Sequence, residues 1–204
     1  MPATFLHYRL RAETLCLGER TRGGTFRPCA SIFSYLTLVG ALKQALDISG
    51  TLHASARFTR SSNDLKREIL TFAPRDRARG VSTIPLQVEY LVDEEADLYI
   101  VHSDSVPALP DSFSFSMGAL RSKGLGRCSA ERIGEHRCDR PREGYLCLRL
   151  PEDLDLRRIF GIGGIPAPRY GYLFKPDSPT MGTYLKSLFE GSKLHAYDVI
   201  LDPE

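Results

Sequence analysis

Several features that would mark particular classes of protein are missing from this sequence. No apolar run approaches the roughly 20 residues that a helix needs to cross a bilayer. Residues 1–9 also lack the layout of a signal peptide. The chain shows neither a fixed-period repeat nor a low-complexity tract. We therefore expect a cytoplasmic protein that has no membrane partner.

The cysteines show no pattern typical of a disulfide framework. They are odd in number and irregularly spaced, without a Cys-x-x-Cys pair: Cys16, Cys29, Cys128, Cys138 and Cys147. Buried thiols are therefore expected. The set Cys128, His136, Cys138 and Cys147 contains the ligand types that zinc prefers. Its spacing matches no standard zinc-binding motif, so we predict no metal and no other cofactor.

Sequence signatures of nucleophilic and nucleotide-binding enzymes are also missing. There is no Gly-x-Ser-x-Gly, no Gly-x-x-x-x-Gly-Lys-Ser/Thr, and the glycines of 161–164 lack dinucleotide-site spacing. Acid/base cleavage of RNA needs only a well-placed histidine, and the chain has His7, His53, His102, His136 and His195. His7 is the best candidate, but a histidine with a satisfied hydrogen bond is the preferred interpretation. We predict no catalytic residue.

The charges are separated along the chain although the net charge is only +2. Basic residues gather at 9–27, 57–79 and 121–142, and acidic residues gather at 93–97 and from 152 onward. Separated blocks of this kind are typical of nucleic-acid-binding proteins with one basic face. With 204 residues, 42% of them hydrophobic, the chain can form one large domain or two small ones around a substantial core.

Hydrophobic periodicity predicts the first elements. Alternating apolar residues indicate a half-buried strand over 4–16, and residues 18–28 form a connection rich in glycine and arginine. An apolar stripe predicts a helix over 31–46, with Ser31 as its N-cap. A second alternating pattern predicts a hairpin of strands 83–92 and 98–102 across an acidic turn. Other strands are predicted at 51–58, 69–72, 127–133, 145–150 and 195–201, and a short helix at 183–189.

Helices do not alternate regularly with strands in this order. A doubly wound parallel sheet is therefore not expected, and we predict an α+β fold with a mainly antiparallel sheet.

The most distinctive stretch is Gly118-Ala119-Leu120-Arg121-Ser122-Lys123-Gly124-Leu125-Gly126-Arg127. Glycines allow backbone angles that a Cβ forbids and let another backbone approach closely. Three cations, Arg121, Lys123 and Arg127, alternate with them. A loop that exposes N–H groups and carries cations suits a phosphodiester backbone.

Two further features would extend such an RNA-binding surface. The connection 18–28 carries the cations Arg20, Arg22 and Arg27. Aromatic residues at Tyr170, Tyr172 and Phe174 would be able to stack on bases. For these aromatics, packing of a strand into the core is the preferred interpretation.

The loop resembles the hallmark of the repeat-associated (RAMP) proteins of CRISPR effector complexes. That hallmark has the form Gly-x-x-Arg-x-Lys/Arg-Gly-aromatic/aliphatic-Gly-Arg and precedes the last strand of a ferredoxin-like, RNA-recognition-type domain. The resemblance covers about residues 4–133. It implies RNA contacts from Gly118, Arg121, Lys123, Gly124, Gly126 and Arg127. Leu125 occupies a position where family members often have an aromatic residue, so base stacking is not expected there.

The resemblance implies a ferredoxin-like domain over 1–133 and a β-rich extension over 134–204. The chain looks most like the subunit group that caps the 5′ handle of the CRISPR RNA (crRNA). Its expected partners are then crRNA, backbone and large subunits of the effector complex, and target nucleic acid. Two alternatives are a metal-independent endoribonuclease that processes crRNA and an unrelated α+β interaction domain whose glycine loop is only a turn.

Overall fold

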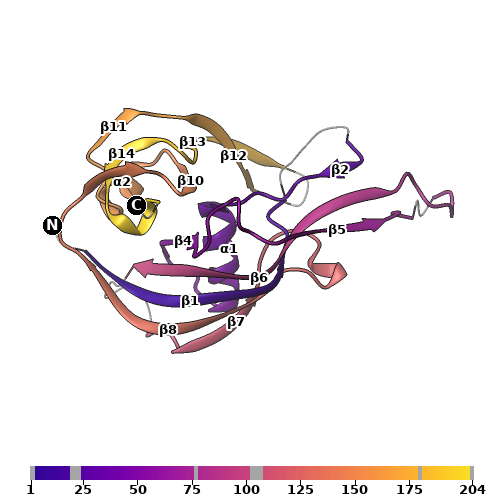
Figure 1. Ribbon diagram of the computed structural model, residues 1–204, viewed down its shortest axis with the longest axis horizontal. Coiled ribbons are helices and arrows are strands. Elements are labelled where there is room, and N and C mark those ends of the chain that lie inside the picture. Colours follow the sequence, from indigo (N-terminus) through magenta and orange to yellow (C-terminus); the bar gives the residue numbers. More distant parts are fainter. Residues whose placement is uncertain (1–2, 19–23, 76–77, 102–107, 179–180, 203–204) are drawn as a thin grey trace.

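The computed structural model describes residues 3–18, 24–75, 78–101, 108–178 and 181–202, and strands dominate it (Figure 1). The strands are β1 (Ala3–Leu15), β2 (Phe26–Arg27), β3 (Phe33–Ser34), β4 (Ala54–Phe58), β5 (Arg67–Phe72), β6 (Leu86–Val101), β7 (Ser112–Ser116), β8 (Arg127–Cys138), β9 (Arg142–Tyr145), β10 (Leu148–Pro151), β11 (Gly164–Ala167), β12 (Tyr170–Pro176), β13 (Gly182–Leu188) and β14 (Lys193–Ala196). The helices are α1 (Tyr35–Ala45) and α2 (Leu154–Ile159), with 3-10 turns η1 (Arg121–Lys123) and η2 (Asp198–Ile200).

The largest sheet is built around β6. One side of β6 pairs with β1, which continues through β8 to β7. The other side pairs with β4 near its end and with β5 near its start. All of these pairs are antiparallel, whereas β2–β6 and β10–β3 are parallel. The predicted α+β fold with a mainly antiparallel sheet is confirmed.

The predicted hairpin across 93–97 is wrong, because β6 is one strand of 16 residues. Arginines on the neighbouring strands hold its acidic middle inside the sheet. Arg11 Nε lies 3.0 Å from Glu95 Oε1, and Arg9 Nη2 lies 3.4 Å from Asp97 Oδ1. The irregularity in the strand is local: Asp93 has a positive φ of 51°.

Glu94 points to the opposite side of β6 and is buried. Its Oε1 accepts hydrogen bonds from the Lys66 backbone N–H at 2.7 Å and from Arg60 Nη1 at 3.3 Å. A buried carboxylate requires such partners because desolvation disfavours its charged form. Glu94 thereby connects the segment before β5 to β6.

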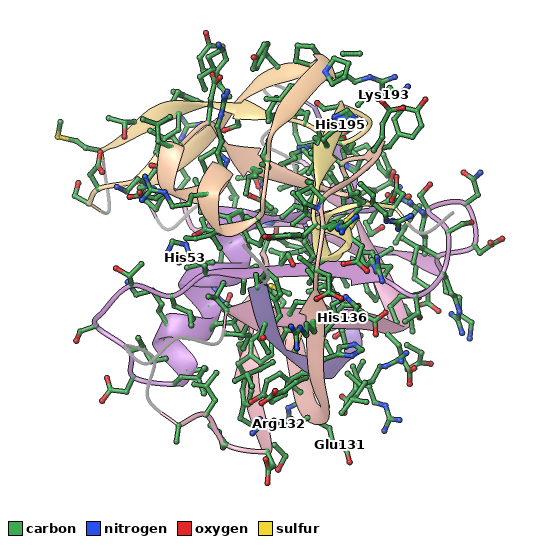
Figure 2. All side chains as sticks on the ribbon, turned by 90° about the vertical axis from the view of Figure 1, so that its left-hand side faces the viewer. His53, Glu131, Arg132, His136, Lys193 and His195 are labelled. Carbon is green, nitrogen blue, oxygen red and sulfur yellow. The ribbon has the colours of Figure 1, made fainter. Side chains whose placement is uncertain are left out.

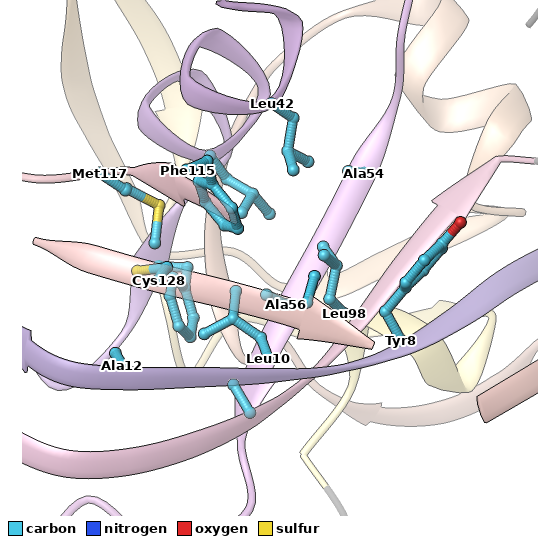
Figure 3. Close-up of a cluster of buried hydrophobic side chains, with 14 of the residues drawn as sticks. Tyr8, Leu10, Ala12, Leu42, Ala54, Ala56, Leu98, Phe115, Met117 and Cys128 are labelled. Atoms are coloured by element: carbon cyan, nitrogen blue, oxygen red, sulfur yellow. The ribbon is translucent and has the colours of Figure 1, made fainter. Parts of the chain in front are cut away.

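One hydrophobic core fills the space between the main sheet and α1. Side chains of β1, β4 and β6 meet Leu42 of α1 and Phe115 of β7 (Figure 3). Members of this core include Tyr8, Leu10, Ala12, Ala54, Ala56, Leu98, Met117 and Cys128.

The elements after β8 form a second core. Strands β10–β14 and α2 gather above the main sheet in Figure 1, and their apolar side chains pack with Phe5, Tyr35 and Tyr99. The predicted helix at 183–189 is wrong, since β13 pairs with β12 from Gly182 to Leu188. The predicted strand at 195–201 is partly wrong: β14 ends at Ala196, and η2 follows.

The start of α1 also differs from the prediction. The helix begins at Tyr35, with Ser34 rather than Ser31 as N-cap. Residues 33 and 34 pair in parallel with Leu148 and Arg149 of β10, which keeps the backbone extended up to the helix. Strand β8 runs past the proposed boundary at 133 and 134 as far as Cys138. Among the described residues, no helix is long and apolar enough to cross a membrane.

Replacing Glu94 tests the buried carboxylate. We expect Glu94→Ala to lower the free energy of unfolding by about 1–3 kcal/mol, because the Lys66 N–H loses its acceptor. Urea denaturation measures the change. Glu131→Ala, at an exposed position of β8, is the matched control and is expected to change stability by about 0.5 kcal/mol or less. Equal effects of the two substitutions would contradict a structural role for Glu94.

Candidate nucleic-acid interface

The glycine loop at 118–127 is anchored by its own backbone to the end of β1. The Ala119 N–H donates to the Cys16 carbonyl at 2.8 Å, and the Gly126 N–H donates to the Thr14 carbonyl at 2.7 Å. The Met117 N–H closes the base of the loop on the Gly126 carbonyl at 2.9 Å. The N–H groups of 119 and 126 are therefore used inside the protein, and the loop is held in one position.

Two of the three glycines are required by this anchoring. Gly118 and Gly126 both have φ of 90°. A Cβ on Gly118 would lie 2.4 Å from the Cys16 oxygen, and one on Gly126 would lie 2.2 Å from the Met117 oxygen. Gly124, with φ of 88°, has open space around it. The close approach expected from the glycines is thus made by the chain's own backbone at 118 and 126, and Gly124 is accessible.

The cations of the loop lie on its outer side. Arg121 and Lys123 belong to the 3-10 turn η1, none of whose residues is buried, and Arg127 begins β8 at an exposed position. Lys123 Nζ lies 5.5 Å from the centre of the Phe72 ring. No carboxylate in the described part of the chain forms an ion pair with Arg121, Lys123 or Arg127. These charges are available to an anionic ligand.

The predicted extension of this surface through 18–28 is described only in part. Arg27 is exposed on β2, at the edge of the main sheet. Arg20 and Arg22 lie outside the described residues.

A cavity of about 250 Å³ lies beside the base of the loop. Its walls come from the loop, the end of β1 and the start of α1: Leu17, Gly18, Ala30, Ile32, Ser34, Thr37, Gly118, Ala119 and Arg149. The Ser34 side chain makes no capping hydrogen bond, and the first turn of α1 contains no acidic residue. The first N–H groups of a helix have no intrahelical acceptor, so this end of α1 suits an anion.

A larger groove of about 790 Å³ adjoins this cavity and shares Arg149, Ala30 and Ile32 with it. Arginines from both parts of the chain line the groove: Arg57, Arg60, Arg149 and Arg169. Glu190 offsets part of this charge, since Arg149 binds it through two hydrogen bonds of 3.0 Å. Burial opposes ionisation of Glu190, but the hydrogen bonds from Arg149 and from its own backbone N–H, together with the charges of Arg149 and Arg169, lower the pKa of this carboxyl.

The sheet face opposite α1 is less suited to RNA. Arg9 and Arg11 pair there with Glu95 and Asp97, and His7 Nε2 lies 3.0 Å from Asp97 Oδ1. Cations that are already paired with carboxylates offer little net attraction to phosphates. The charges of Arg9 and Arg11 are therefore largely neutralised within the protein.

Each described histidine contacts a carboxylate or a hydroxyl group. His7 bonds to Asp97 and stacks on Tyr99 at 4.6 Å, and His136 bonds to Asp198 at 3.0 Å. His195 Nε2 lies 3.3 Å from Glu143. His53 Nδ1 lies 2.7 Å from the Tyr35 hydroxyl, and burial lowers the pKa of this histidine. His102 lies outside the described residues.

The five cysteines are buried free thiols, as expected. Burial raises the pKa of Cys128 and of Cys147 to about 12. Cys128, His136, Cys138 and Cys147, the possible zinc ligands in the sequence, do not form one cluster. Cys128 lies in the first core and Cys147 in the second. His136 and Cys138 do approach each other, together with Asp198 of η2. Sequence spacing could not reveal Asp198, because it lies 60 residues from Cys138.

The prediction that the β12 aromatics pack in the core is wrong for two of them. Tyr170 is 48% exposed and Tyr172 is 67% exposed. Phe174 is half-buried and packs edge-on against Tyr184 of β13, at 5.3 Å between ring centres. Lys186 lies 4.0 Å from the Tyr170 ring centre. Leu173, on the other face, is buried, so alternation along β12 leaves Tyr170 and Tyr172 outside.

The chain was compared with known proteins. No family model and no curated protein matches it. Among solved structures, a chain of a type III-B Cmr-beta complex bound to cognate target RNA and AMPPnP matches with a TM-score of 0.60. The sequences are 12% identical, and the match covers 93% of this chain and 86% of that chain. This protein therefore shares the fold of that chain.

A second Cmr-beta structure, bound to cognate target RNA, supports the same assignment. Its TM-score is 0.58 at 10% identity, over 93% of this chain and 86% of that chain. The resemblance to CRISPR complex proteins that the glycine loop indicated is therefore confirmed at the level of the Cmr-type fold. The narrower subgroup that caps the 5′ handle stays a prediction.

Two glycine substitutions test how the loop is held. Gly126→Ala places a methyl group against the Met117 carbonyl and should lower the free energy of unfolding by about 3 kcal/mol or more. Gly124→Ala has a similar φ but open space, so we expect a loss of about 1 kcal/mol. Urea denaturation of both variants measures the difference. Equal losses would show that the anchoring of the loop to β1 and Met117 is unimportant.

Proposed function

We propose that this protein is a non-catalytic crRNA-binding subunit of a CRISPR effector complex. The glycine loop would hold the repeat-derived 5′ end of the guide in the cytoplasm. The observation that carries the proposal is the presentation of Arg121, Lys123 and Arg127, without carboxylate partners among the described residues, on a loop anchored to β1.

The surroundings of the loop support a phosphate-binding role. The cavity beside it contains the uncapped N-terminus of α1. Arg169 lines the adjoining groove, whose other arginines, Arg57, Arg60 and Arg149, pair with Asp97, Glu94 and Glu190. Phosphate groups bind favourably both to cations and to the first N–H groups of a helix. A single RNA strand leaving the loop would therefore meet further favourable contacts in the cavity and the groove.

The strand order supports a ferredoxin-like first domain over 1–133. Strand β1, helix α1 and strands β4, β6 and β8 follow one another in the chain, and the strands lie in the order β4, β6, β1, β8. In the described residues 108–126, strand β7 and the η1 turn occupy the place where a second helix of such a domain would be. Residues 134–204 would be the β-rich extension that packs on it.

The proposed partners are crRNA, the backbone and large subunits of the complex, and target nucleic acid. The matching solved complexes are described as bound to cognate target RNA. A processing endoribonuclease is the less favoured function, because the described histidines contact Asp97, Tyr35, Asp198 and Glu143 and none of them belongs to the glycine loop.

The triple variant Arg121→Ala, Lys123→Ala and Arg127→Ala tests the proposal. We expect it to lose most of its affinity for a single-stranded RNA with the repeat-derived 5′ sequence. Removal of three phosphate contacts should also make the slope of log K against log salt concentration shallower by about 2. Fluorescence anisotropy of the full chain with labelled RNA, at several salt concentrations, measures both effects.

The matched control removes the same charge elsewhere. Arg140, Arg158 and Lys175 are exposed cations outside the loop, and their triple alanine variant should retain the affinity and the slope. Equal losses of RNA affinity in both variants would show that binding depends on total charge and not on the position of the loop cations. Full RNA affinity in the loop variant would overturn the proposal, and absence of RNA binding by the wild-type chain would favour an interaction domain. A cut in repeat RNA in the presence of EDTA would favour the endoribonuclease.

A further inference from the structure

A cluster of three potential metal ligands lies where the C-terminal part of the chain meets the main sheet. His136 and Cys138 are two residues apart on β8 and point to the same side, and Asp198 begins the η2 turn. One ligand atom from each residue lies within 4.8 Å of the others. Figure 2 labels His136 among the strands of the main sheet, with the C-terminal strands above it.

The geometry is close to that of a zinc site. His136 Nε2 lies 3.0 Å from Asp198 Oδ1, and Cys138 Sγ lies 3.1 Å from the same oxygen. Around a tetrahedral zinc, with bonds of about 2.0–2.3 Å, ligand atoms are about 3.3–3.6 Å apart. These two separations need to widen by only a few tenths of an ångström to admit the ion, and all three ligand atoms lie within 4.8 Å of one another.

The ligand types select the metal. A thiolate and an imidazole favour Zn²⁺ or a similar transition metal, whereas Mg²⁺ and Ca²⁺ prefer oxygen ligands. A thiolate and a carboxylate together balance the charge of a divalent ion. On binding, the Cys138 thiol proton leaves to solvent, and the imidazole presents the Nε2 lone pair.

The site is accessible from solvent although its sulfur is buried. The side chains of His136 and Asp198 are 31% and 33% exposed, and Cys138 is 4% exposed. An ion can therefore enter from the solvent side, and water can occupy its fourth position. His7 lies near His136, with 6.4 Å between ring centres, but its Nε2 is bonded to Asp97.

The elements that carry the ligands are already connected by hydrogen bonds. Ser55 Oγ donates to the Val199 carbonyl at 2.8 Å, and Arg57 Nη1 donates to the Asp198 carbonyl at 3.0 Å. These bonds hold η2 against β4, and Asp198 at the start of η2 contacts His136 and Cys138 of β8. Arg57 is a cation beside the cluster, and its guanidinium is directed to main-chain oxygens and to Asp97.

We propose that His136, Cys138 and Asp198 form a zinc-type metal site that fastens the C-terminal turn to the main sheet. The ion would have a structural role, since it links β8 to a segment 60 residues later in the chain. This site is separate from the glycine loop, so the proposal does not depend on RNA binding.

Titration of the EDTA-treated full chain with Co²⁺ and then Zn²⁺ tests the site. We expect one equivalent of Co²⁺ to produce a thiolate-to-cobalt charge-transfer band that Zn²⁺ displaces. Cys138→Ser should abolish this band, and His136→Gln or Asp198→Asn should weaken Zn²⁺ binding by about tenfold or more, at least the loss seen for outer-shell partners. Zn²⁺ at 100 times its dissociation constant should raise the thermal midpoint by about 5 °C.

Two control variants replace a cysteine and a histidine that lie outside the cluster. Cys147→Ser removes a buried thiol outside the cluster, and His195→Gln removes an exposed histidine bonded to Glu143. Both should retain the band and the Zn²⁺ affinity. The proposal is overturned if the wild-type chain gives no thiolate band, or if Cys138→Ser and Cys147→Ser bind Co²⁺ equally. Circular dichroism of each variant without metal confirms that it is folded before titration.

Discussion

Pairing between arginines and carboxylates across neighbouring strands is the interaction on which the main sheet depends. Without the guanidinium groups of Arg9, Arg11 and Arg57, the middle of β6 would place Glu95 and Asp97 beside each other with no counter-charge. With them, β6 continues without a break and joins β1 to β4 and β5. The same pairing neutralises the sheet face opposite α1, whereas the loop cations Arg121, Lys123 and Arg127 have no carboxylate partner among the described residues.

The position of that surface follows from backbone contacts. The loop carries its cations on a 3-10 turn, but hydrogen bonds to Cys16 and Thr14 decide where the turn lies relative to α1. Because Gly118 and Gly126 have no Cβ, the loop can approach these carbonyl groups closely. The result places exposed cationic side chains on an anchored backbone next to an uncapped helix N-terminus, an arrangement suited to phosphate groups.

The junction between the two cores has a different character. It combines hydrogen bonds from Ser55 and Arg57 to η2 with the His136, Cys138 and Asp198 cluster. Strand β8 contributes to the main sheet and also carries two residues of this cluster. The junction therefore couples the stability of the C-terminal part to that of the main sheet, and a metal ion there would strengthen the coupling.

Local patterns by themselves determined the first strand, the existence of α1, the buried state of the cysteines and the glycine loop. These features depend on side-chain periodicity or on short-range composition, which are present in the sequence. Tertiary structure decided the continuity of β6, the strand at Gly182–Leu188 and the exposure of Tyr170 and Tyr172. Each depends on residues distant in the chain: arginines that neutralise an acidic segment, a partner strand, or a neighbour that covers one face. The contact between Asp198 and Cys138 also depends on tertiary structure, because only folding brings these two segments, 60 residues apart in the chain, together.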